Sequence, residues 1–383
     1  MAKDYIKDYI KYFSTQTGGA PRQEKLAWAI QETLTENDLK LFFLLPFAGS
    51  TNLGKLNKKA LHAGFSQTEF EDCLKRLHEE GFIISYDGKQ ERVYERAFVS
   101  FTVEQQVRRR KGTPIGAAYG EFWDGLATLT SSMPSKTPYF RVAPVEASLT
   151  GKSNTVVIPV NMPIPDPREV LPVDVISDMV RNEALIGISE CYCRLAKENR
   201  GDGVCEHERE TCFTFNELAQ TLIETGLARQ INAEEAVTIL RKAEDDGLIH
   251  NVDNCQGHLK ALCNCCPCCC PAIKSYEAGV RNVNSASRFL AVMHEDLCTN
   301  CGTCVAVCPV QAITEGDLFP LFMQEKCIGC GHCVTKCPEG AIQMVLREDL
   351  PKIPATNDQL WSTIRREAVV TMVKEKVLGK PKR

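Results

Sequence analysis

Two stretches near the carboxyl end, CTNCGTCVAVCP at residues 298–309 and CIGCGHCVTKCP at residues 327–338, decide how that part of the chain folds. Each contains three cysteines separated by two residues, a fourth cysteine after three more residues, and then a proline. This spacing is typical of loops that hold cubane iron–sulfur clusters. Zinc fingers use two CxxC pairs separated by a longer finger, and disulfide frameworks need an oxidising compartment. Neither pattern accounts for eight cysteines in this register.

In two-cluster proteins with this spacing, the fourth cysteine of each stretch ligates the cluster of the other stretch. One [4Fe-4S] cluster is therefore expected on Cys298, Cys301, Cys304 and Cys337. A second [4Fe-4S] cluster is expected on Cys327, Cys330, Cys333 and Cys308. Each stretch is incomplete without its partner, so this segment should fold only when its iron is bound. Gly302, Gly329 and Gly331 suit the tight path of a loop around a cube.

The segment from Ser287 to Val345 resembles bacterial-type dicluster ferredoxins. The resemblance includes the residues after each proline, ValGlnAlaIle from Val310 and GluGlyAlaIle from Glu339. It implies short strands and helices over the clusters, and electron transfer as the activity. Phe322, between the two stretches, is expected to shield a cluster from water, and His332 is expected to face solvent.

The composition of the whole chain sets further bounds. With 383 residues, it has room for two or three folded units besides this segment. The net charge of −4 argues against a general nucleic-acid binder. The first residues are charged and amphipathic, and no apolar stretch is long enough for a bilayer, so neither a secretory signal nor a membrane span is expected. We expect a cytoplasmic protein of an anaerobic host, where a set of 20 cysteines favours metal ligation over disulfides.

Residues 1–105 are expected to form N-terminal helices and a winged-helix-like domain. Helical patterns at 36–45, 55–63 and 66–80 precede two strands joined by a turn at Asp87-Gly88. The third helix is acidic, whereas a helix that reads the major groove carries Arg, Lys, Asn or Gln. We therefore prefer a structural or protein-contact role and expect no nucleic acid. Cys73 of this helix is expected in the core.

The region between the front and the cysteine-rich part is expected to be an extended linker, residues 106–171. Its basic run, Arg108 to Lys111, is expected to be solvated surface. Its end, within 158–172, is dense in proline and should be extended. Residues 172–286 are expected to form a helical, cysteine-rich domain around a helix-turn-helix-like unit at 215–251, which repeats the pattern of 65–83. Residues 287–347 then form the dicluster domain, and residues 348–383 form a tail helix.

The cysteine-rich domain contains two groups of thiols. The first group is Cys191, Cys193, Cys205 and Cys212. The second group is Cys263, Cys265, Cys266, Cys268, Cys269 and Cys270, preceded by Cys255. Free cysteine packs as a small buried hydrophobe, and a polar loop with proline offers little such burial, so metal binding is favoured.

We expect a third [4Fe-4S] cluster on the first group, and a fourth is allowed on four thiols of the second. Spacing cannot select those four, and unused thiols can form a non-cubane cluster or a redox-active vicinal pair. Zinc is the alternative for both groups, with His207 close to the first in the sequence.

The chain from Pro172 to Val345 also resembles a group of anaerobe proteins described as 4Fe-4S ferredoxin-domain proteins. The resemblance rests on CysTyrCysArg at Cys191, GluThrCysPhe at Glu210, GlyLeuIleHis at Gly247 and the cysteine run from Leu262. It implies a role as an electron-transfer partner of larger redox enzymes.

We therefore expect an α+β chain that relays single electrons between a low-potential donor and a partner oxidoreductase. The sequence has no nucleophile paired with a base, no dinucleotide-binding glycine pattern and no phosphate loop, so no catalytic residue is assigned. One alternative is a catalytic oxidoreductase or reductive activator that uses the middle thiols. Another is a redox-responsive winged-helix regulator.

Overall fold

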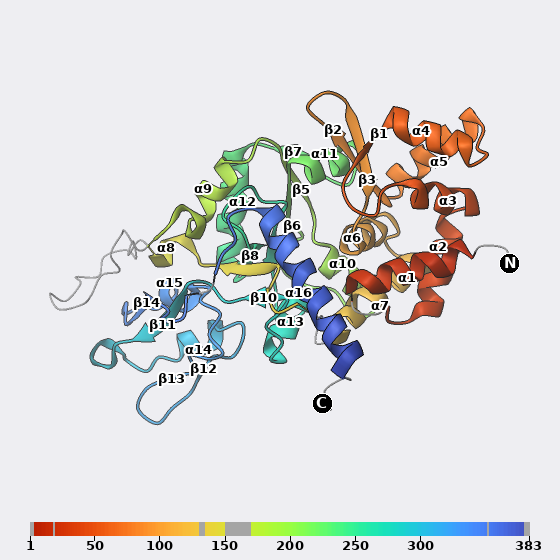
Figure 1. Cartoon of the computed structure of the whole chain (residues 1–383). Helices are drawn as coiled ribbons and strands as arrows, with labels where there is room; N and C mark the ends of the chain where they lie inside the picture. Colours follow the sequence, from red (N-terminus) through yellow and green to blue (C-terminus); the bar gives the residue numbers. More distant parts are fainter. Residues whose placement is uncertain (1–3, 18–19, 130–134, 150–169, 351, 379–383) are drawn as a thin grey trace. The chain divides into compact units, whose positions relative to one another are not determined.

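The structure, a computed structural model, describes residues 4–17, 20–129, 135–149, 170–350 and 352–378 (Figure 1). The chain is of mixed α+β type and divides into two compact units, each built from two separate segments. Unit 1 comprises residues 1–133 and 185–231, and unit 2 comprises residues 134–184 and 232–383. This division differs from the five consecutive domains expected, because the middle region 172–286 is shared between the units.

The front of unit 1 contains five helices and a three-stranded sheet. The helices are α1 (Tyr5–Thr17), α2 (Gln23–Thr33), α3 (Glu36–Leu44), α4 (Leu53–His62) and α5 (Gln67–Glu79). Strands β2 (Ile83–Asp87) and β3 (Arg92–Arg96) form an antiparallel hairpin, and β1 (Thr51–Asn52) pairs with the free side of β3. The last three helices and the hairpin lie within about two residues of the positions expected from the sequence.

Helix capping and aromatic packing explain why these residues fold as they do. The Ser66 hydroxyl accepts a hydrogen bond from the Glu69 N–H, and the Glu69 carboxylate accepts one from the Ser66 N–H, which forms a capping box at the start of α5. In the core, the ring of Tyr9 lies 4.9 Å from those of Phe13 and Phe42. Cys73 is buried on α5, as expected.

Helices α6 (Val99–Arg109) and α7 (Pro114–Leu129) follow, in place of the start of the expected linker. The expectation of extended chain is wrong for 106–129, because apolar residues recur there at helical spacing. Val103 and Val107 of α6 are buried, as are Tyr119 and Phe122 of α7. The proline-dense end of the linker lies largely outside the described residues.

The second segment of unit 1 adds three antiparallel strands. Strand β5 (Ile186–Glu190) pairs with β6 (Glu210–Phe215) on one side and with β7 (Arg229–Ile231) on the other. Helix α10 (Tyr192–Asn199) follows β5 and packs on α6 and α7, and α11 (Asn216–Glu224) follows β6. Segments far apart in the sequence therefore complete one core.

Four of the described strands of unit 2 are hydrogen-bonded side by side in the order β10-β4-β8-β9. They are β4 (Phe140–Ala143), β8 (Ile249–Asp253), β9 (Ala261–Cys265) and β10 (Asn284–Ser285). Strand β4 runs parallel to β10 and antiparallel to β8, and β8 is antiparallel to β9. The helices among them are α8 (Glu146–Leu149), a 3-10 turn (Pro172–Asp174), α9 (Ile176–Arg181), α12 (Ala233–Asp245) and α13 (Pro271–Glu277).

The expected second helix-turn-helix-like unit is divided, since α11 belongs to unit 1 and α12 to unit 2. Asn232 caps α12 by accepting a hydrogen bond from the Glu235 N–H at 2.9 Å. Gly247, with φ +75°, ends this helical segment. Asn232 and Gly247 thus mark the two ends of this helical segment.

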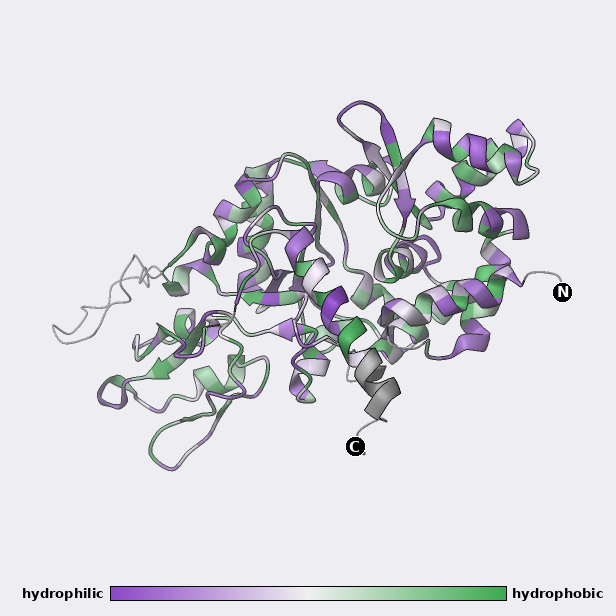
Figure 2. Ribbon diagram, viewed as in Figure 1, coloured by the Kyte–Doolittle hydropathy of each residue, from purple (hydrophilic) through white to green (hydrophobic). Residues whose placement is uncertain are grey.

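The remainder of unit 2 consists of short elements and a long tail helix. Strand β11 (Phe289–Met293) pairs with β14 (Ile342–Leu346), and β12 (Ile313–Thr314) pairs with β13 (Leu321–Phe322). The short helices are a 3-10 turn (Glu295–Leu297), α14 (Thr303–Val307) and α15 (His332–Thr335). The tail helix α16 (Asn357–Leu378) carries both hydrophilic and hydrophobic residues (Figure 2). Its Glu367 accepts hydrogen bonds from the N–H groups of Lys136 and Thr137, each at 2.9 Å.

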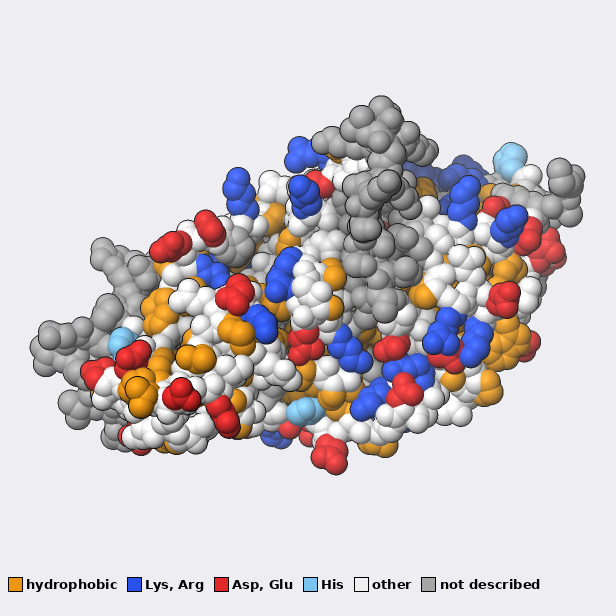
Figure 3. All heavy atoms as spheres, turned by 90° about the horizontal axis from the view of Figure 1, so that it is seen from below, with side chains coloured by type: hydrophobic (Ala, Val, Ile, Leu, Met, Phe, Trp, Pro, Cys, Tyr) orange, Lys and Arg blue, Asp and Glu red, His pale blue; other side chains and the backbone are white. Residues whose placement is uncertain are grey.

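No helix in the described ranges is both long and apolar enough to cross a bilayer. On the face seen in Figure 3, acidic and basic side chains are interspersed with hydrophobic ones. This mixture agrees with the small net charge of −4.

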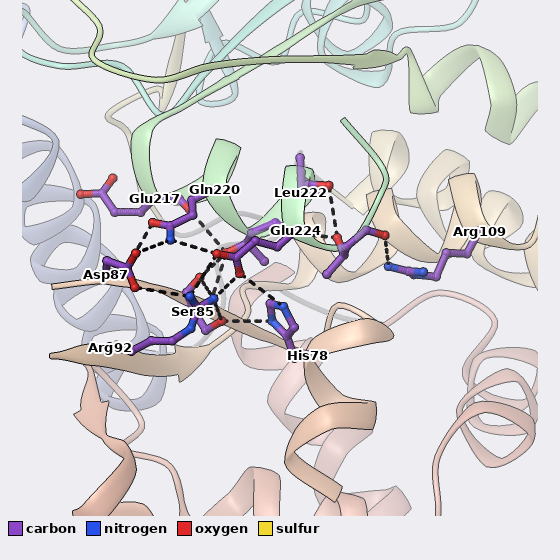
Figure 4. Close-up of polar contacts among 11 residues, drawn as sticks. His78, Ser85, Asp87, Arg92, Arg109, Glu217, Gln220, Leu222 and Glu224 are labelled. Atoms are coloured by element: carbon purple, nitrogen blue, oxygen red, sulfur yellow. Dashed lines mark hydrogen bonds and ion pairs between the residues drawn. The ribbon is translucent and has the colours of Figure 1, made fainter. Parts of the chain in front are cut away.

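A polar network joins the β2–β3 hairpin to α11 (Figure 4). Arg92 donates from Nη1 to Glu224 Oε1 at 3.0 Å and from Nη2 to Ser85 Oγ at 2.8 Å. Gln220 Nε2 donates to Asp87 Oδ2 and to Glu224 Oε1, each at 3.0 Å. A small apolar cluster that includes residues of the hairpin and of α11 accompanies this network. Glu224 is thus the shared acceptor that ties the two segments of unit 1 together.

Replacing Glu224 by Gln is expected to lower the free energy of unfolding by about 1 kcal/mol at pH 7, because a half-exposed Arg–carboxylate pair is lost. Burial alone would raise the pKa of the Glu224 carboxyl, but the hydrogen bonds from Arg92 and Gln220 outweigh burial and lower it. A lowered folded-state pKa means that the stabilisation is complete above the ordinary value and is lost as the pH falls through the folded-state value.

The difference between Glu224→Gln and the wild type should therefore stay constant from pH 7 to about pH 5 and shrink at lower pH. Denaturant unfolding followed by circular dichroism measures it. Glu217→Gln, at an exposed position of the same helix, is the matched control and should change stability by less than about 0.5 kcal/mol. A Glu224→Gln deficit that is equally large at pH 3.5 would contradict the role of the charge.

Candidate metal centres

Two cavities lie in the C-terminal part of unit 2, and four cysteines line each of them. The first cavity is lined by Cys298, Cys301, Cys304 and Cys337. The second cavity is lined by Cys308, Cys327, Cys330 and Cys333. These are the two sets expected from the crossover pattern, with three sulfurs from one stretch and one from the other. Four thiols around one cavity are the donor set of a cubane cluster, so the residues fit a [4Fe-4S] cluster at each site.

The two stretches follow the same backbone path around their cavities. Three equivalent positions in and just after each stretch have left-handed backbone angles, with φ between +51° and +86°. These positions are Asn300, Gly302 and Gln311 for the first stretch, and Gly329, Gly331 and Gly340 for the second. Left-handed residues reverse the local direction of the chain, which lets a short loop surround a compact group. The repeat in sequence is therefore a repeat in conformation.

Backbone N–H groups donate to cysteine sulfurs at equivalent positions of the two stretches. The Ala312 N–H lies 3.2 Å from Cys308 Sγ, and the Ala341 N–H lies 3.3 Å from Cys337 Sγ. Both sulfurs belong to the fourth cysteine of their stretch. Hydrogen bonds to cluster sulfurs stabilise negative charge and help to set the reduction potential. Backbone donors are thus placed alike at the fourth cysteine of each stretch.

The cavities differ in their exposure to solvent. In the first, Cys301 is exposed, and hydrogen bonding with Thr303 lowers the pKa of its thiol. In the second, Cys330 is buried, and burial raises the pKa of its thiol to about 12. Phe322, which was expected to shield a cluster, lines this second cavity. The first cavity is accordingly the outer one, and the second is the inner one.

His332 does not face solvent, contrary to the expectation from sequence. It is 2% exposed, and its Nε2 lies 3.0 Å from the Leu248 carbonyl oxygen. A carbonyl only accepts, so Nε2 carries the proton in this arrangement. Burial lowers the pKa of the imidazole. The imidazole is buried because α15 packs against α8 and β14, and spacing within the cysteine stretch cannot reveal these contacts.

The loop around the inner cavity lies close to α8 and to Val145, the residue just before it. The Val145 N–H donates to the Cys330 carbonyl oxygen at 2.8 Å. A β carbon at Gly331 would lie 2.3 Å from Ser148 Oγ and 2.7 Å from Ser148 Cβ. Gly331 is therefore required both by its φ of +86° and by the lack of space.

The first group of middle cysteines lies entirely in unit 1. Cys191 is the N-cap of α10, Cys193 lies in its first turn, and Cys212 lies on β6 opposite Ser189 of β5. Cys205 lies in the loop between α10 and β6, which also contains His207. The pairing of β5 with β6 brings the start and the end of this segment to the same end of the strands.

Buried charge surrounds this first group. Arg108 of α6 interacts electrostatically with the thiols of Cys212 and Cys191. It donates to the Glu190 carbonyl oxygen at 2.8 Å and forms an ion pair with Glu104. Its Nη2 is buried and has no hydrogen-bond partner among the residues that the structure describes. A buried guanidinium N–H that lacks an acceptor and lies beside thiols fits an anionic metal–thiolate centre.

Arg108 was expected on the solvated surface, and that expectation is wrong, because its side chain is only 3% exposed. Trp123 of α7 was also missed; its Nε1 donates to Cys193 Sγ at 3.4 Å. Neither residue is near the cysteines in sequence, so only the helical periodicity of α6 and α7 gave a signal that these segments are buried.

The second group of middle cysteines lies in unit 2 and separates into two sets. The first set is Cys263, Cys265 and Cys270, and the second is Cys266, Cys268 and Cys269. Residues 263 and 265 share one face of β9 because side chains alternate along a strand. After β9, a turn with Pro267 reverses the chain, and the N–H groups of Cys269 and Cys270 both donate to the Cys266 carbonyl oxygen. Cys270 Sγ thereby returns to 3.3 Å from Cys265 Sγ.

The other set is Cys266, Cys268 and Cys269, whose sulfurs lie within 4.8 Å of one another. Tetrahedral zinc with bonds of about 2.3 Å places its sulfurs roughly 3.8 Å apart, so this set fits a single thiophilic ion. Cys255 lies outside both sets, with its Sγ 3.8 Å from the His258 carbonyl oxygen.

Comparison with known families agrees with the geometry of the two cavities. The family described as 4Fe-4S dicluster domain matches residues 290–342. This part of the chain is therefore a ferredoxin-like iron–sulfur domain. Comparisons with curated proteins and with solved structures found no match.

Gly331→Ala should destabilise the iron–sulfur domain by about 2 to 4 kcal/mol, from roughly 1 kcal/mol of left-handed strain and the rest from the clash with Ser148. Gly302→Ala is the matched control. Gly302 has φ +74°, but a β carbon added there would meet open space within 4 Å, so only the strain applies. Anaerobic denaturant unfolding, followed by cluster absorbance, compares the two variants.

Adding Ser148→Gly to Gly331→Ala should recover the part of the loss that is due to the clash. Equal effects of Gly331→Ala and Gly302→Ala would show that α8 does not constrain the inner loop.

Proposed function

We propose that this protein is a multi-cluster iron–sulfur electron-transfer protein, which relays single electrons between a low-potential donor and a partner oxidoreductase. The observation that carries the proposal is the pair of four-cysteine cavities within the segment that matches the dicluster family. When bound there, [4Fe-4S] clusters supply one-electron redox chemistry. The crossover ligand sets, with Cys337 in the first and Cys308 in the second, are part of the proposal.

Packing supports electron passage between the two sites. Cys304, from the outer cavity, and Cys333, from the inner one, belong to the same buried cluster. Cys308 and Cys327 pack against this cluster and also against a second one deeper in unit 2. The two cavities thus share a wall of apolar side chains and sulfurs. Because Cys301 is exposed, we propose that the partner exchanges electrons at the outer cavity.

A third [4Fe-4S] cluster is proposed on Cys191, Cys193, Cys205 and Cys212. The orphan Nη2 of Arg108 supports an anionic group at this place, and the hydrogen bond from Trp123 supplies a further donor to sulfur. Zinc remains the alternative. For Cys266, Cys268 and Cys269, the close sulfur spacing favours a single metal ion over a cube.

We propose that the front of unit 1 is winged-helix-like. Two features support this proposal: the succession of its helices along the chain and the strand order β1-β3-β2. Its helix α5 carries Glu69, Glu71, Asp72 and Glu79. This acidic surface favours protein contact over contact with nucleic-acid phosphates.

Quantitation of iron, acid-labile sulfide and zinc in anaerobically prepared protein tests the assignments. The two ferredoxin-like sites should contribute about eight irons per chain, and the third site about four more. Serine at both Cys327 and Cys330 should remove the inner cluster, and with it about four irons and one electron paramagnetic resonance signal of the reduced protein. Serine at both Cys191 and Cys212 should likewise remove about four irons and one signal, those of the third site.

Arg108→Met tests the third site separately, because it keeps the four thiols and removes the charge. This variant should leave the electron paramagnetic resonance signals of the ferredoxin-like domain unchanged. It should shift or abolish the signal of the third site. Serine at Cys73, a buried thiol outside all sites, is the control. Protein that contains zinc and no iron would refute the electron-transfer function.

A further inference from the structure

The contact between Cys265 and Cys270 in unit 2 has no role in the sites proposed above. Their sulfurs lie 3.3 Å apart, and both residues are 6% exposed. Asn251 of β8 donates from Nδ2 to Cys265 Sγ, also at 3.3 Å. A disulfide bond is about 2.05 Å long, so bond formation requires the sulfurs to approach by only about 1 Å.

Local structure holds the two thiols in place. Cys265 is the last residue of β9, which is hydrogen-bonded to β8, and Cys270 is the N-cap of α13. The turn between them is closed by the bonds to the Cys266 carbonyl oxygen, and Pro271 fixes the start of α13. The loop that a disulfide would close is already formed, so little chain entropy opposes the bond.

The surroundings of the pair link it to the inner cavity. Cys265, Cys270 and Cys330 belong to one buried cluster, and Cys308 and Cys327 pack against it. Three of the four sulfurs that line the inner cavity therefore share a packed core with the pair. Because both sulfurs of the pair are buried, direct attack on a large external disulfide is disfavoured, whereas electron transfer through the neighbouring domain needs no such access.

We propose that Cys265 and Cys270 form a reversible dithiol–disulfide couple that stores a pair of electrons next to the inner cavity. On reduction, the sulfur–sulfur bond breaks, two electrons and two protons are taken up, and two thiols form. On oxidation, the same electrons and protons leave and the bond forms again. The proposal rests on the one-electron function of the ferredoxin-like domain, which supplies the electrons singly from a low-potential donor.

This couple gives the chain a second kind of redox chemistry. Two [4Fe-4S] sites together exchange two electrons, which is the number that one disulfide accepts. The chain can thus convert single-electron transfer into the storage of an electron pair.

Differential thiol labelling of the full, iron-loaded chain tests the proposal. Anaerobic protein is oxidised with thionine or reduced with methyl viologen radical, quenched in acid and alkylated in denaturant with light N-ethylmaleimide. Disulfides are then reduced and alkylated with the heavy reagent. Cleavage after Lys260 and Lys274 yields one peptide, residues 261–274, that contains all six thiols, and fragmentation locates each label.

We expect heavy label on Cys265 and Cys270 after oxidation, light label on both after viologen treatment, and light label on Cys73 throughout. Protein with serine at Cys327 and Cys330, which lacks the inner site, should be reduced at Cys265 and Cys270 at least tenfold more slowly. Cys265→Ser and Cys270→Ser should each abolish heavy labelling of the partner and leave the iron content unchanged.

Light label on both thiols after oxidation would overturn the couple, and so would loss of iron in Cys265→Ser, which would make this residue a metal ligand. Equal reduction rates with and without the inner site would overturn its link to the ferredoxin-like domain. Iron content and electron paramagnetic resonance of the wild type are measured in the same samples. Their normal values would show that the failure concerns the thiol pair and not the electron-transfer function.

Discussion

The C-terminal part of this protein depends on a single demand: four thiol sulfurs must face one small cavity, and neither cysteine stretch can meet it alone. Each stretch contributes three sulfurs to its own cavity and one to the other, so the two loops have to fold together. Residues with left-handed backbone angles at equivalent positions, such as Gly302 and Gly331, let each short loop surround its cavity. The pairing of β11 with β14 then closes the domain by joining its first and last segments.

Features that depend on residues close together in the chain could be predicted from the sequence. The ferredoxin-like domain, the last three front helices and the β2–β3 hairpin depend on residues a few positions apart, and each lies close to where it was expected. The α+β class was also correct. What local spacing cannot encode is which distant segments share a core. Residues 106–129 were expected as linker, yet they form α6 and α7 and place Arg108 and Trp123 against the thiols of unit 1.

The run of cysteines after Leu262 shows the same limit at shorter range. Any four of these six thiols could in principle bind one metal centre, and the sequence alone does not distinguish among the possible sets of four. Strand alternation along β9 and the reversal at Pro267 make them unequal, because Cys270 is turned back toward Cys265 while Cys266, Cys268 and Cys269 gather on the turn. The difference between the sets lies in backbone direction, which becomes visible only when the strand boundary is known.

The interleaving of the two units has a consequence for biosynthesis. Unit 1 needs residues 185–231 in addition to 1–133, so the intervening part of unit 2 leaves the ribosome before unit 1 is complete. That part, residues 134–184, must then wait for partners that begin at residue 232, and the first cysteine-lined cavity is complete only after Cys337 has been synthesised. Nascent chains would therefore expose unpaired strands such as β4 for much of their synthesis, which makes this region a natural client for chaperones until the second cysteine loop has emerged.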